Sequence, residues 1–260
     1  MKRRSHIIVG NWKMNPRTPE DARLIFSKIK RTALCLRRTD VVVCPSYIHL
    51  SALAKLASRT WVSLGVQDVF WESDGFFTGK VSAAMAKNAG AEYAIVGHSE
   101  ARKLGDTDDM VALKLEFVLR ERMTAIVCVG EKERDRDGRF FEELKGQILA
   151  SLAHAPRGFL ATSTIIAYEP LWTIGRSNFQ AMKPREVHET SIFIRKVIND
   201  TFGAEASELP ILYGGSVAPE NAAALVHDGG VEGLLVGRQS LDPTAFSQIM
   251  KTVDANYAKR

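Results

Sequence analysis

The chain has 260 residues, of which 45% are apolar, a formal net charge of +5 and a sequence pI near 9.1. This length suits one large α/β domain, and no low-complexity linker or block of like charge divides it. No apolar run approaches the roughly 18 residues of a membrane span, and the apolar stretch near the start is too short for a signal peptide. We therefore expect neither a membrane anchor nor a secretory leader.

The three cysteines, Cys35, Cys44 and Cys128, are an odd number without metal-ligand spacing. Cys44 and Cys128 lie in apolar runs, so a reducing cytoplasm is the expected location. The basic residues are spread over many segments without interleaved aromatic residues, which argues against a nucleic-acid-binding surface. A mild positive field would instead attract a small anionic substrate.

Apolar runs typical of buried strands recur along the chain, with segments of helical spacing between them. The eight runs are 7–9, 41–44, 62–66, 93–96, 124–129, 164–168, 209–213 and 233–236. The clearest helical patterns lie at 22–29, 110–118, 144–152 and 187–198. Strands that alternate with helices form either a doubly wound sheet or a closed barrel, and eight repeats in this length favour a single-domain (β/α)8 barrel over residues 1–260.

Polar residues or glycines follow nearly every predicted strand at its carboxyl end. They are Asn11, Lys13, Gln67, His98, Glu100, Glu131, Glu169, Gly214, Gly215, Ser216, Gly237 and Arg238. Barrel enzymes place their chemistry at this rim. The sequence therefore predicts one shared site there.

Glu169 follows the β-branched run at 162–166, and Pro170 next to it cannot donate to a strand ladder. The residues up to Gly175 are bulky and apolar and those after it are polar, as in a loop that closes over a site. Taken alone, a glutamate before a proline is more often a helix-capping carboxylate after an ordinary strand. The hypothesis that Glu169 belongs to an active site therefore depends on whether other polar groups lie close to it.

Two further rim residues supply a charge and a proton donor. Lys13 would offer a fixed positive charge to a phosphate or a developing oxyanion, although alone it could be a surface lysine. His98 precedes Ser99, which could cap a helical turn. An imidazole at a helix amino terminus stays neutral and can donate a proton to a carbonyl oxygen, although a lone histidine is more often structural.

Glycine turns follow the last two predicted strands, at Gly214-Gly215-Ser216 and at Gly237-Arg238. Glycines let backbone N–H groups crowd around an anion, and barrels commonly bind phosphate at these two strands. One such turn would indicate little, but two favour a phosphate site.

Six motifs together resemble the triosephosphate isomerase family. In chain order they are Asn11-Trp12-Lys13-Met14-Asn15, Gly97-His98-Ser99-Glu100, Cys128-Val129-Gly130-Glu131, Ala167-Tyr168-Glu169-Pro170, Tyr213-Gly214-Gly215-Ser216 and Leu234-Leu235-Val236-Gly237. The resemblance implies a TIM barrel that interconverts dihydroxyacetone phosphate and D-glyceraldehyde 3-phosphate through an enediolate. It also implies a cytoplasmic homodimer of glycolysis and gluconeogenesis that uses neither a metal nor a cofactor.

The resemblance assigns roles residue by residue. Glu169 is similar to the base that moves a proton between neighbouring carbons, and His98 to the neutral electrophile that polarises the carbonyl. This family is itself the standard illustration of such a histidine and of lid closure. Lys13, with Asn11 beside it, is similar to the residue that binds phosphate and stabilises the enediolate. Glu100 is similar to an acid that contacts this lysine.

Phosphate binding is implied for the backbone N–H groups of Gly175, Ser216 and Gly237 beneath a closed lid, which excludes water from the enediolate. Two departures affect this region. The lid at 176–180 lacks the family's Thr-Gly-Lys, and Arg238 replaces the second glycine of a pair. We expect Arg238 to act on the phosphate side.

A third departure concerns the partner subunit. The segment 75–80 resembles the loop that inserts into a second subunit, but Lys80 replaces an acid and Ala101 replaces the arginine that pairs with it. Because both halves of the ion pair are missing, neither charge is buried alone. Thr78 and the apolar residues around it remain, so we expect a homodimer that depends on packing.

Three alternatives stay open. Isomerisation of a four-carbon ketose phosphate is a close rival, because relatives that act on tetrulose phosphates also depart in the lid and place arginine after the last glycine. A phosphate-binding barrel without activity would require damage at Lys13, His98 or Glu169, and none is visible. A nucleic-acid binder is the least favoured, because it needs a contiguous basic stripe.

Overall fold

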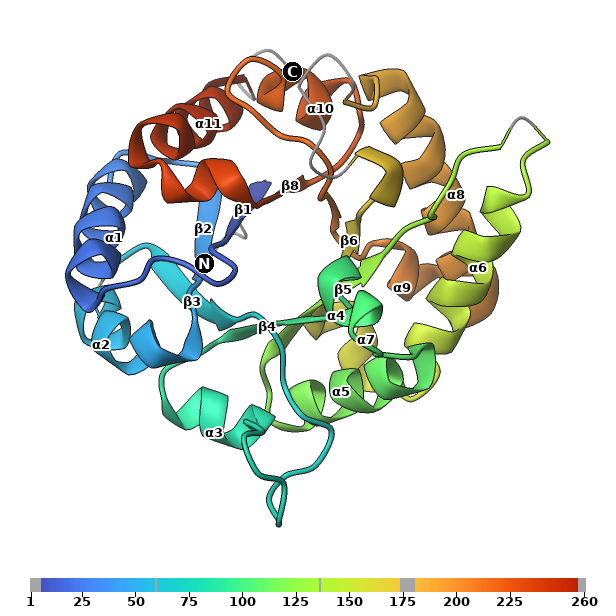
Figure 1. The fold of residues 1–260 in the computed structure, drawn as a ribbon. Helices are drawn as coiled ribbons and strands as arrows, with labels where there is room; N and C mark the ends of the chain where they lie inside the picture. Colours follow the sequence, from blue (N-terminus) through green and yellow to red (C-terminus); the bar gives the residue numbers. More distant parts are fainter. Residues whose placement is uncertain (1–5, 59, 136, 174–180, 257–260) are drawn as a thin grey trace.

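The computed structural model describes residues 6–58, 60–135, 137–173 and 181–256. Within these residues, eight parallel strands pair in chain order and close into a barrel, with β8 paired back to β1 (Figure 1). The strands are β1 (His6–Asn11), β2 (Thr39–Cys44), β3 (Val62–Val66), β4 (Tyr93–Val96), β5 (Thr124–Val129), β6 (Thr164–Tyr168), β7 (Ile211–Tyr213) and β8 (Gly233–Val236). The predicted (β/α)8 barrel is confirmed.

Helices surround this barrel as an outer ring (Figure 1). In the described residues they are α1 (Pro19–Ala33), α2 (Tyr47–Ala57), α3 (Ala83–Asn88), α4 (Ser99–Lys103), α5 (Asp108–Arg120), α6 (Phe140–Ser151), α7 (Arg157–Ser163), α8 (Pro184–Phe202), α9 (Ala204–Ser207), α10 (Ala222–His227) and α11 (Pro243–Asn256). Two 3₁₀ helices, η1 (Leu171–Thr173) and η3 (Arg238–Leu241), follow β6 and β8. No helix in these ranges is long and apolar enough to cross a membrane.

Local sequence signals explain where the longer helices begin. The Thr18 side chain accepts a hydrogen bond from the backbone N–H of Asp21, and Pro19 occupies the first turn of α1. At α8, Pro184 again occupies the first turn, and the Glu186 side chain accepts a bond from the backbone N–H of Lys183. These caps satisfy donors that a helix cannot satisfy internally.

The core has two layers because each strand is buried on both faces. One layer fills the barrel interior with small and branched side chains, among them Val9, Val42, Ile126 and Leu212. The larger layer lies between the strands and the helices and includes Phe26, which is fully buried. Parallel strands covered on both faces read as continuous apolar runs rather than as alternating ones. This is why the strands were visible in the sequence.

Three strands differ in extent from the predicted runs: β1 and β2 extend beyond 7–9 and 41–44, and β7 is shorter than 209–213. The seventh strand starts at Ile211 rather than at residue 209, because Pro210 has no N–H to donate to the ladder. Thr162 and Ser163 were read as part of the run that leads to Glu169, but they end α7. Packing of Leu160, which is only 3% exposed, outweighs the β-preference of the residues that follow it.

Candidate active site

A cavity of about 400 Å³ lies at the carboxyl ends of the strands. Nearly all rim residues singled out in the sequence line it: Asn11, Lys13, His98, Glu100, Glu169, Gly214, Gly215, Ser216, Gly237 and Arg238. Gly175 and the altered lid at 176–180 lie outside the described residues. Gln67 and Glu131, also expected at the rim, take supporting positions instead.

Glu169 leaves β6 with its carboxylate almost fully buried. Its backbone N–H donates to the carbonyl of Val129 at 2.8 Å, which continues the ladder with β5 for one residue beyond the strand. Its Oε1 lies 3.0 Å from Nε2 of His98, and its Oε2 accepts a 3.0 Å hydrogen bond from the backbone N–H of Ser99. Only 3% of the Glu169 side chain is exposed, so the acid is held by polar partners inside a water-poor site.

The hydrogen bonds of His98 define its tautomer. Its Nδ1 accepts a hydrogen bond from the backbone N–H of Glu100 at 3.1 Å, which requires an unprotonated Nδ1. The proton of the neutral ring therefore resides on Nε2, where it faces the carboxylate of Glu169. His98 is thus itself the cap of α4. The expectation that Ser99 caps this turn is wrong, and its hydroxyl has no hydrogen-bond partner among the described residues.

Lys13 sits in a strained backbone conformation, with φ of 54°. Its N–H donates to Oδ1 of Asn11 at 3.1 Å, and its carbonyl accepts bonds from Nε2 of Gln67 at 2.7 Å and Oγ of Ser46 at 3.0 Å. Three polar side chains thus hold this conformation. The sequence offered no signal for Ser46, and it marked Gln67 only by its place after a strand.

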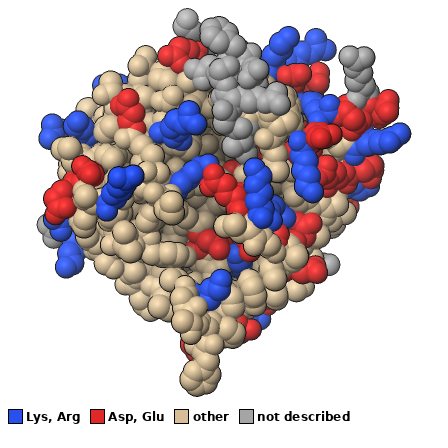
Figure 2. Space-filling view, in the orientation of Figure 1, with Lys and Arg blue, Asp and Glu red and all other residues tan. Residues whose placement is uncertain are grey.

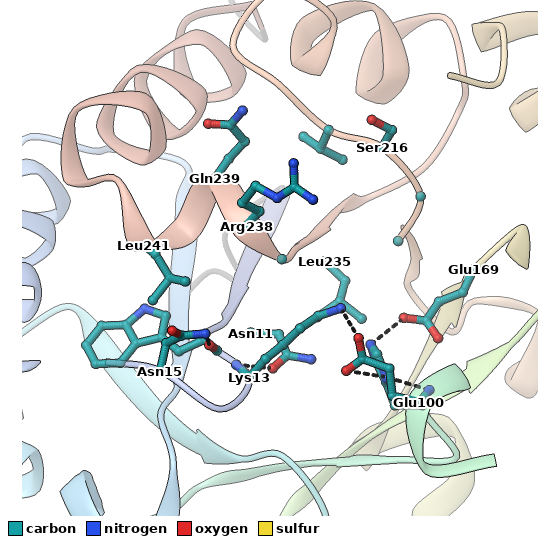
Figure 3. A pocket seen from close by; sticks show the side chains of 16 residues that line it. Asn11, Lys13, Asn15, Glu100, Glu169, Ser216, Leu235, Arg238, Gln239 and Leu241 are labelled. Atoms are coloured by element: carbon teal, nitrogen blue, oxygen red, sulfur yellow. Dashed lines mark hydrogen bonds and ion pairs between the residues drawn. The ribbon is translucent and has the colours of Figure 1, made fainter. Parts of the chain in front are cut away.

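The ammonium of Lys13 reaches across the mouth of the barrel. Its Nζ lies 2.7 Å from Oε1 of Glu100, with Glu169 on the far side of that acid (Figure 3). Partial burial alone would raise the pKa of Glu100, but the hydrogen bond and the charge of Lys13 lower it more, so the net pKa lies below that of an ordinary glutamate. The carboxylate of Glu100 therefore stays ionised at neutral pH.

Arg238 opens η3 beside the lysine stem. A side chain on the preceding Gly237 would meet Cε of Lys13 at 3.4 Å, so this turn passes close to the lysine. Arg238 and Gln239 both line the cavity (Figure 3), and Arg238 forms no ion pair with another residue of the described ranges. The cavity thus contains two cationic side chains near the glycine turns.

Glu131 lies beneath η1 and supports it. It is fully buried, and its Oε1 accepts hydrogen bonds from the hydroxyl of Tyr168 at 2.8 Å and from Nε1 of Trp172 at 2.9 Å. Burial and the adjacent charge of Glu131 raise the pKa of Tyr168 well above that of an ordinary tyrosine, so the phenol remains a donor. The sequence placed Glu131 at the rim, but the structure places it beneath η1.

The thiol of Cys128 lies in the layer that fills the barrel interior. Burial, followed by the charge of Glu169, raises its pKa well above that of a free thiol, so it remains protonated. None of the described His, Cys, Asp or Glu residues forms a group of three that could hold a metal ion. The groups that converge on the cavity are two acids, Glu100 and Glu169, with a neutral imidazole and two cationic side chains.

These groups define a class of protein. A parallel eight-stranded barrel with an acid, an imidazole and an ammonium at its mouth is a barrel enzyme equipped to move protons next to an oxygen that gains negative charge.

Comparison with known proteins narrows this class. The family model described as triosephosphate isomerase matches residues 6–253. Triosephosphate isomerase of Moorella thermoacetica is 39% identical over 249 residues, which cover 95% of this chain and 98% of that protein. The corresponding protein of Trichlorobacter lovleyi is 36% identical over 251 residues, with 95% and 98% covered. The crystal structure of triosephosphate isomerase from Bartonella henselae superposes with a TM-score of 0.84 at 32% identity, covering 95% of this chain and 98% of that one.

The chain belongs to the triosephosphate isomerase family and is an aldose–ketose isomerase that acts on a phosphorylated sugar.

Proposed function

We propose that this isomerase interconverts dihydroxyacetone phosphate and D-glyceraldehyde 3-phosphate, with Glu169 as the base and His98 as the electrophile. The observation that carries the proposal is the 3.0 Å approach of Nε2 of His98 to Oε1 of Glu169 at one cavity. When substrate binds, its carbonyl oxygen replaces the Glu169 carboxylate as the partner of Nε2 and accepts a hydrogen bond from the neutral ring of His98. Its neighbouring C–H group then lies within reach of the displaced acid.

The proton transfers balance as follows. A Glu169 oxygen takes a proton from the carbon next to the carbonyl, and the electrons of that C–H bond pass to the carbonyl oxygen, giving an enediolate. His98 donates its Nε2 proton to one oxygen and recovers a proton from the other. Glu169 returns its proton to the neighbouring carbon. Both oxygens of the acid are engaged in the present structure, so substrate must displace the His98 contact.

Lys13 stabilises the charge that develops on the enediolate oxygens. Its Nζ already lies 2.7 Å from Glu100, so it is held at the mouth of the barrel before substrate arrives. Preorganised charge of this kind avoids reorganisation during the reaction, which is the usual source of electrostatic catalysis. Asn11 fixes the lysine backbone and takes part in binding. Glu100 acts by holding the ammonium in place.

The phosphate group binds between the glycine turns, where Ser216 and Gly237 line the cavity. Their backbone N–H groups are the proposed donors, with Lys13 and Arg238 as cationic partners. Gly175 is proposed as a third donor, from a segment outside the described residues. No cofactor enters this scheme.

An isomerase assay on the wild type and on Glu169→Gln tests the proposal. The amide cannot accept the carbon-bound proton, so we expect kcat to fall by about 10³-fold or more with KM little changed. Glu208→Gln, at an exposed carboxylate on the opposite end of the barrel, should keep wild-type activity. Unchanged turnover in Glu169→Gln would refute the mechanism, and an inactive wild type would favour a binding barrel without activity.

A four-carbon ketose phosphate is the second candidate substrate. The observation in its favour is the pair of long polar side chains, Arg238 and Gln239, that line the cavity next to the phosphate turns. The chemistry at His98 and Glu169 would be the same. Values of kcat/KM for a triose phosphate and for a tetrulose phosphate, measured side by side, decide between them. We expect the triose phosphate to be the better substrate.

Basic and acidic side chains are interspersed on the face drawn in Figure 2, without a continuous basic stripe. This face therefore lacks the contiguous basic stripe that nucleic-acid binding needs. The free thiols of Cys44 and Cys128 are buried and that of Cys35 is exposed, which supports a reducing cytoplasmic location. One barrel domain over residues 1–260 is our interpretation of the chain.

We further propose that two copies of the chain form a dimer. The loop after β3 projects from the barrel beyond α3 (Figure 1). Within this loop, Phe76 is 107% and Phe77 44% exposed relative to a free residue. Met14 and Leu104, on other loops, are 93% and 91% exposed. Side chains of this size are normally covered, and the loop around Thr78 is proposed to cover Met14 and Lys13 of the second copy.

The pairing charges expected in the family are replaced by contacts within one chain. The ammonium of Lys80 lies 5.7 Å from the centre of the Phe70 ring, and Ala101 provides no charge opposite it. The interface therefore depends on apolar packing. Sedimentation at micromolar concentration should give twice the chain mass of 28.8 kDa at both low and high salt. A monomer would refute the dimer, and Phe76→Asp should dissociate it.

A further inference from the structure

Arg102, in α4, binds the peptide groups on both sides of His98. Its Nε donates to the carbonyl of Gly97 at 2.7 Å, and its backbone N–H donates to the carbonyl of His98 at 3.0 Å. The direction of the imidazole depends on these two peptide planes, because His98 leaves the strand between them. We propose that Arg102 is a positioning residue that fixes His98 in the orientation required for proton transfer.

The guanidinium is itself anchored to three other elements. Its Nη1 lies 2.5 Å from Asp108 at the start of α5, and its Nη2 donates to Oγ of Ser151 at 3.1 Å, at the end of α6. Nη2 also approaches the carbonyl of Cys128 in β5 at 3.4 Å. Ser151 and Asp108 are joined by a hydrogen bond of 3.3 Å. Only 14% of the Arg102 side chain is exposed, so these anchors make it part of the barrel wall.

The space beside Gly97 is tightly packed, in part by the Arg102 guanidinium. The residue has φ of +69°, and a side chain there would meet Nη2 of Arg102 at 3.0 Å and Cγ1 of Val111 at 2.9 Å. The guanidinium therefore fills the space beneath Gly97 and donates a hydrogen bond to the Gly97 carbonyl oxygen. Without the guanidinium, the peptide between Gly97 and His98 loses its side-chain partner, and the imidazole is free to turn away from Glu169.

The planar fork of arginine is needed for this arrangement. Nε donates a hydrogen bond to Gly97, while Nη1 and Nη2 donate to Asp108 and Ser151. A lysine ammonium cannot span these positions at once. Besides stabilising the barrel wall, the guanidinium holds the peptide next to His98 through its bond to Gly97. The partner Asp108 has 35% of its side chain exposed, and partly exposed ion pairs contribute little to folding.

The inference rests on the proposed role of His98 and is tested with Arg102→Met and Arg102→Lys. We expect kcat to fall by about 100-fold in both, as for displacements of about 1 Å at a reacting group. KM and inhibition by inorganic phosphate should stay within about two-fold, because Lys13 and Gly237 come from other strands. Each kcat is divided by the folded fraction measured by circular dichroism, and Arg102→Lys provides the test if Arg102→Met does not fold.

Two matched variants separate positioning from general stability. Arg120→Met removes an arginine of α5 that is 60% exposed and pairs with Glu116 one turn away, so activity should not change. Asp108→Asn loosens an outer anchor but leaves the bond from Nε to Gly97. We expect it to lower the melting temperature while kcat falls by no more than about three-fold. Equal losses of kcat per folded molecule in Asp108→Asn and Arg102→Met would overturn the proposal.

A double-mutant cycle with His98→Asn provides the decisive comparison. If Arg102 acts through the imidazole, Arg102→Met should cost about 100-fold with His98 present and only a few-fold in its absence. Equal costs in both backgrounds, or wild-type kcat in Arg102→Met, would refute the inference. Wild-type kcat in His98→Asn itself would refute the proposed function instead.

Discussion

Oε1 of Glu169 lies 3.0 Å from Nε2 of His98, although the strands that deliver them, β6 and β4, are separated in the barrel by β5. The contact therefore depends on how closely the end of β5 lets its neighbours approach. Gly130 is the residue at that point. A Cβ atom on Gly130 would lie 1.8 Å from the carbonyl oxygen of Glu169, so the backbone after β6 occupies the space where any side chain would be.

Gly130→Ala should therefore damage both stability and catalysis. The added methyl group must push the backbone of Glu169 away, because neither of the two groups in contact is a flexible side chain. We expect a loss of about 1–3 kcal/mol in the free energy of unfolding, as for overpacked sites. Loss of the contact with His98 should lower kcat by about 100-fold. Urea unfolding and steady-state kinetics measure the two effects.

Gly146 provides the control for that substitution. It lies in α6, is exposed, and has no atom within 4 Å of the position of an added Cβ. Gly146→Ala should raise the free energy of unfolding by about 0.5–1 kcal/mol, because alanine favours a helix over glycine, and should leave kcat unchanged. If Gly130→Ala behaved in the same way, the prediction that Gly130 packs directly against the backbone of Glu169 would be refuted.

A second prediction concerns pH and the last helix. Asp254 in α11 accepts hydrogen bonds from the backbone N–H groups of Arg37, at 3.1 Å, and Arg38, at 2.9 Å, which tie that helix to the segment before β2. Burial alone would raise the pKa of Asp254, but these bonds lower it more, so its pKa in the folded protein lies below the ordinary value of 3.8.

The sign of the effect follows from this shift. The folded protein holds the proton of Asp254 less tightly than the unfolded chain, so the stabilisation is complete above about pH 4 and is lost as the pH falls through the folded pKa. The stability difference between the wild type and Asp254→Asn should be constant from pH 5 to 7 and shrink below about pH 4. Glu189→Gln, in an exposed pair with Arg185, should show almost no difference at any pH. A difference that grows in acid would contradict the prediction.

The third prediction tests the support of Lys13. Gln67→Leu keeps the side-chain volume but removes the 2.7 Å bond to the lysine carbonyl and the 3.0 Å bond to that of Cys44. Ser46 still binds the Lys13 carbonyl, so the cost in stability should be about 1 kcal/mol. The hydrogen bond from Gln67 helps to maintain the strained φ of Lys13. Because its loss lets the lysine backbone relax, kcat/KM should fall by about 10-fold. Unchanged kcat/KM in a destabilised variant would contradict the prediction, because Ser46 and Asn11 would then hold the Lys13 backbone without Gln67.

The reacting groups could be predicted from the sequence because buried barrel strands appear as continuous apolar runs, and catalytic residues lie directly after them. Glu169, His98 and Lys13 were each found as a polar residue just after an apolar run. Gln67 and Glu131 were marked in the same way, but other supporting residues carry no such mark. Ser46 and Arg102 act through contacts with distant segments, and neither composition nor spacing reveals which carbonyl a side chain will reach.

The errors have the same origin. Thr162 has β-preference, but the packing of Leu160 keeps it and Ser163 in a helix. Ser99 looked like a better cap than His98, because imidazole is not among the usual capping side chains. Glu131 follows β5 like a rim residue, yet the hydroxyl of Tyr168 and the indole of Trp172 hold it beneath the surface. Local preference was overruled by tertiary contacts in each case.

The last prediction concerns Arg238, whose side chain lines the cavity without an ion-pair partner in the described residues. If the guanidinium contacts the substrate phosphate, Arg238→Ala removes a charged hydrogen bond worth about 1.5 kcal/mol, and KM should rise about 10-fold with kcat little changed. Inhibition by inorganic phosphate should weaken by the same factor, and Arg238→Lys should recover part of the loss because it keeps the charge.

Arg185→Ala is the matched control, because Arg185 is 89% exposed on α8 and pairs only with Glu189 in the described structure. It should leave both kinetic constants unchanged. The two candidate substrates refine the test. A loss that is equal for triose and tetrulose phosphates places the guanidinium at the phosphate they share, whereas a larger loss for the four-carbon substrate places it at the additional carbon and hydroxyl. Unchanged KM and kcat for both substrates would remove Arg238 from the binding site, because a cation in contact with a dianion cannot be deleted without weakening its binding.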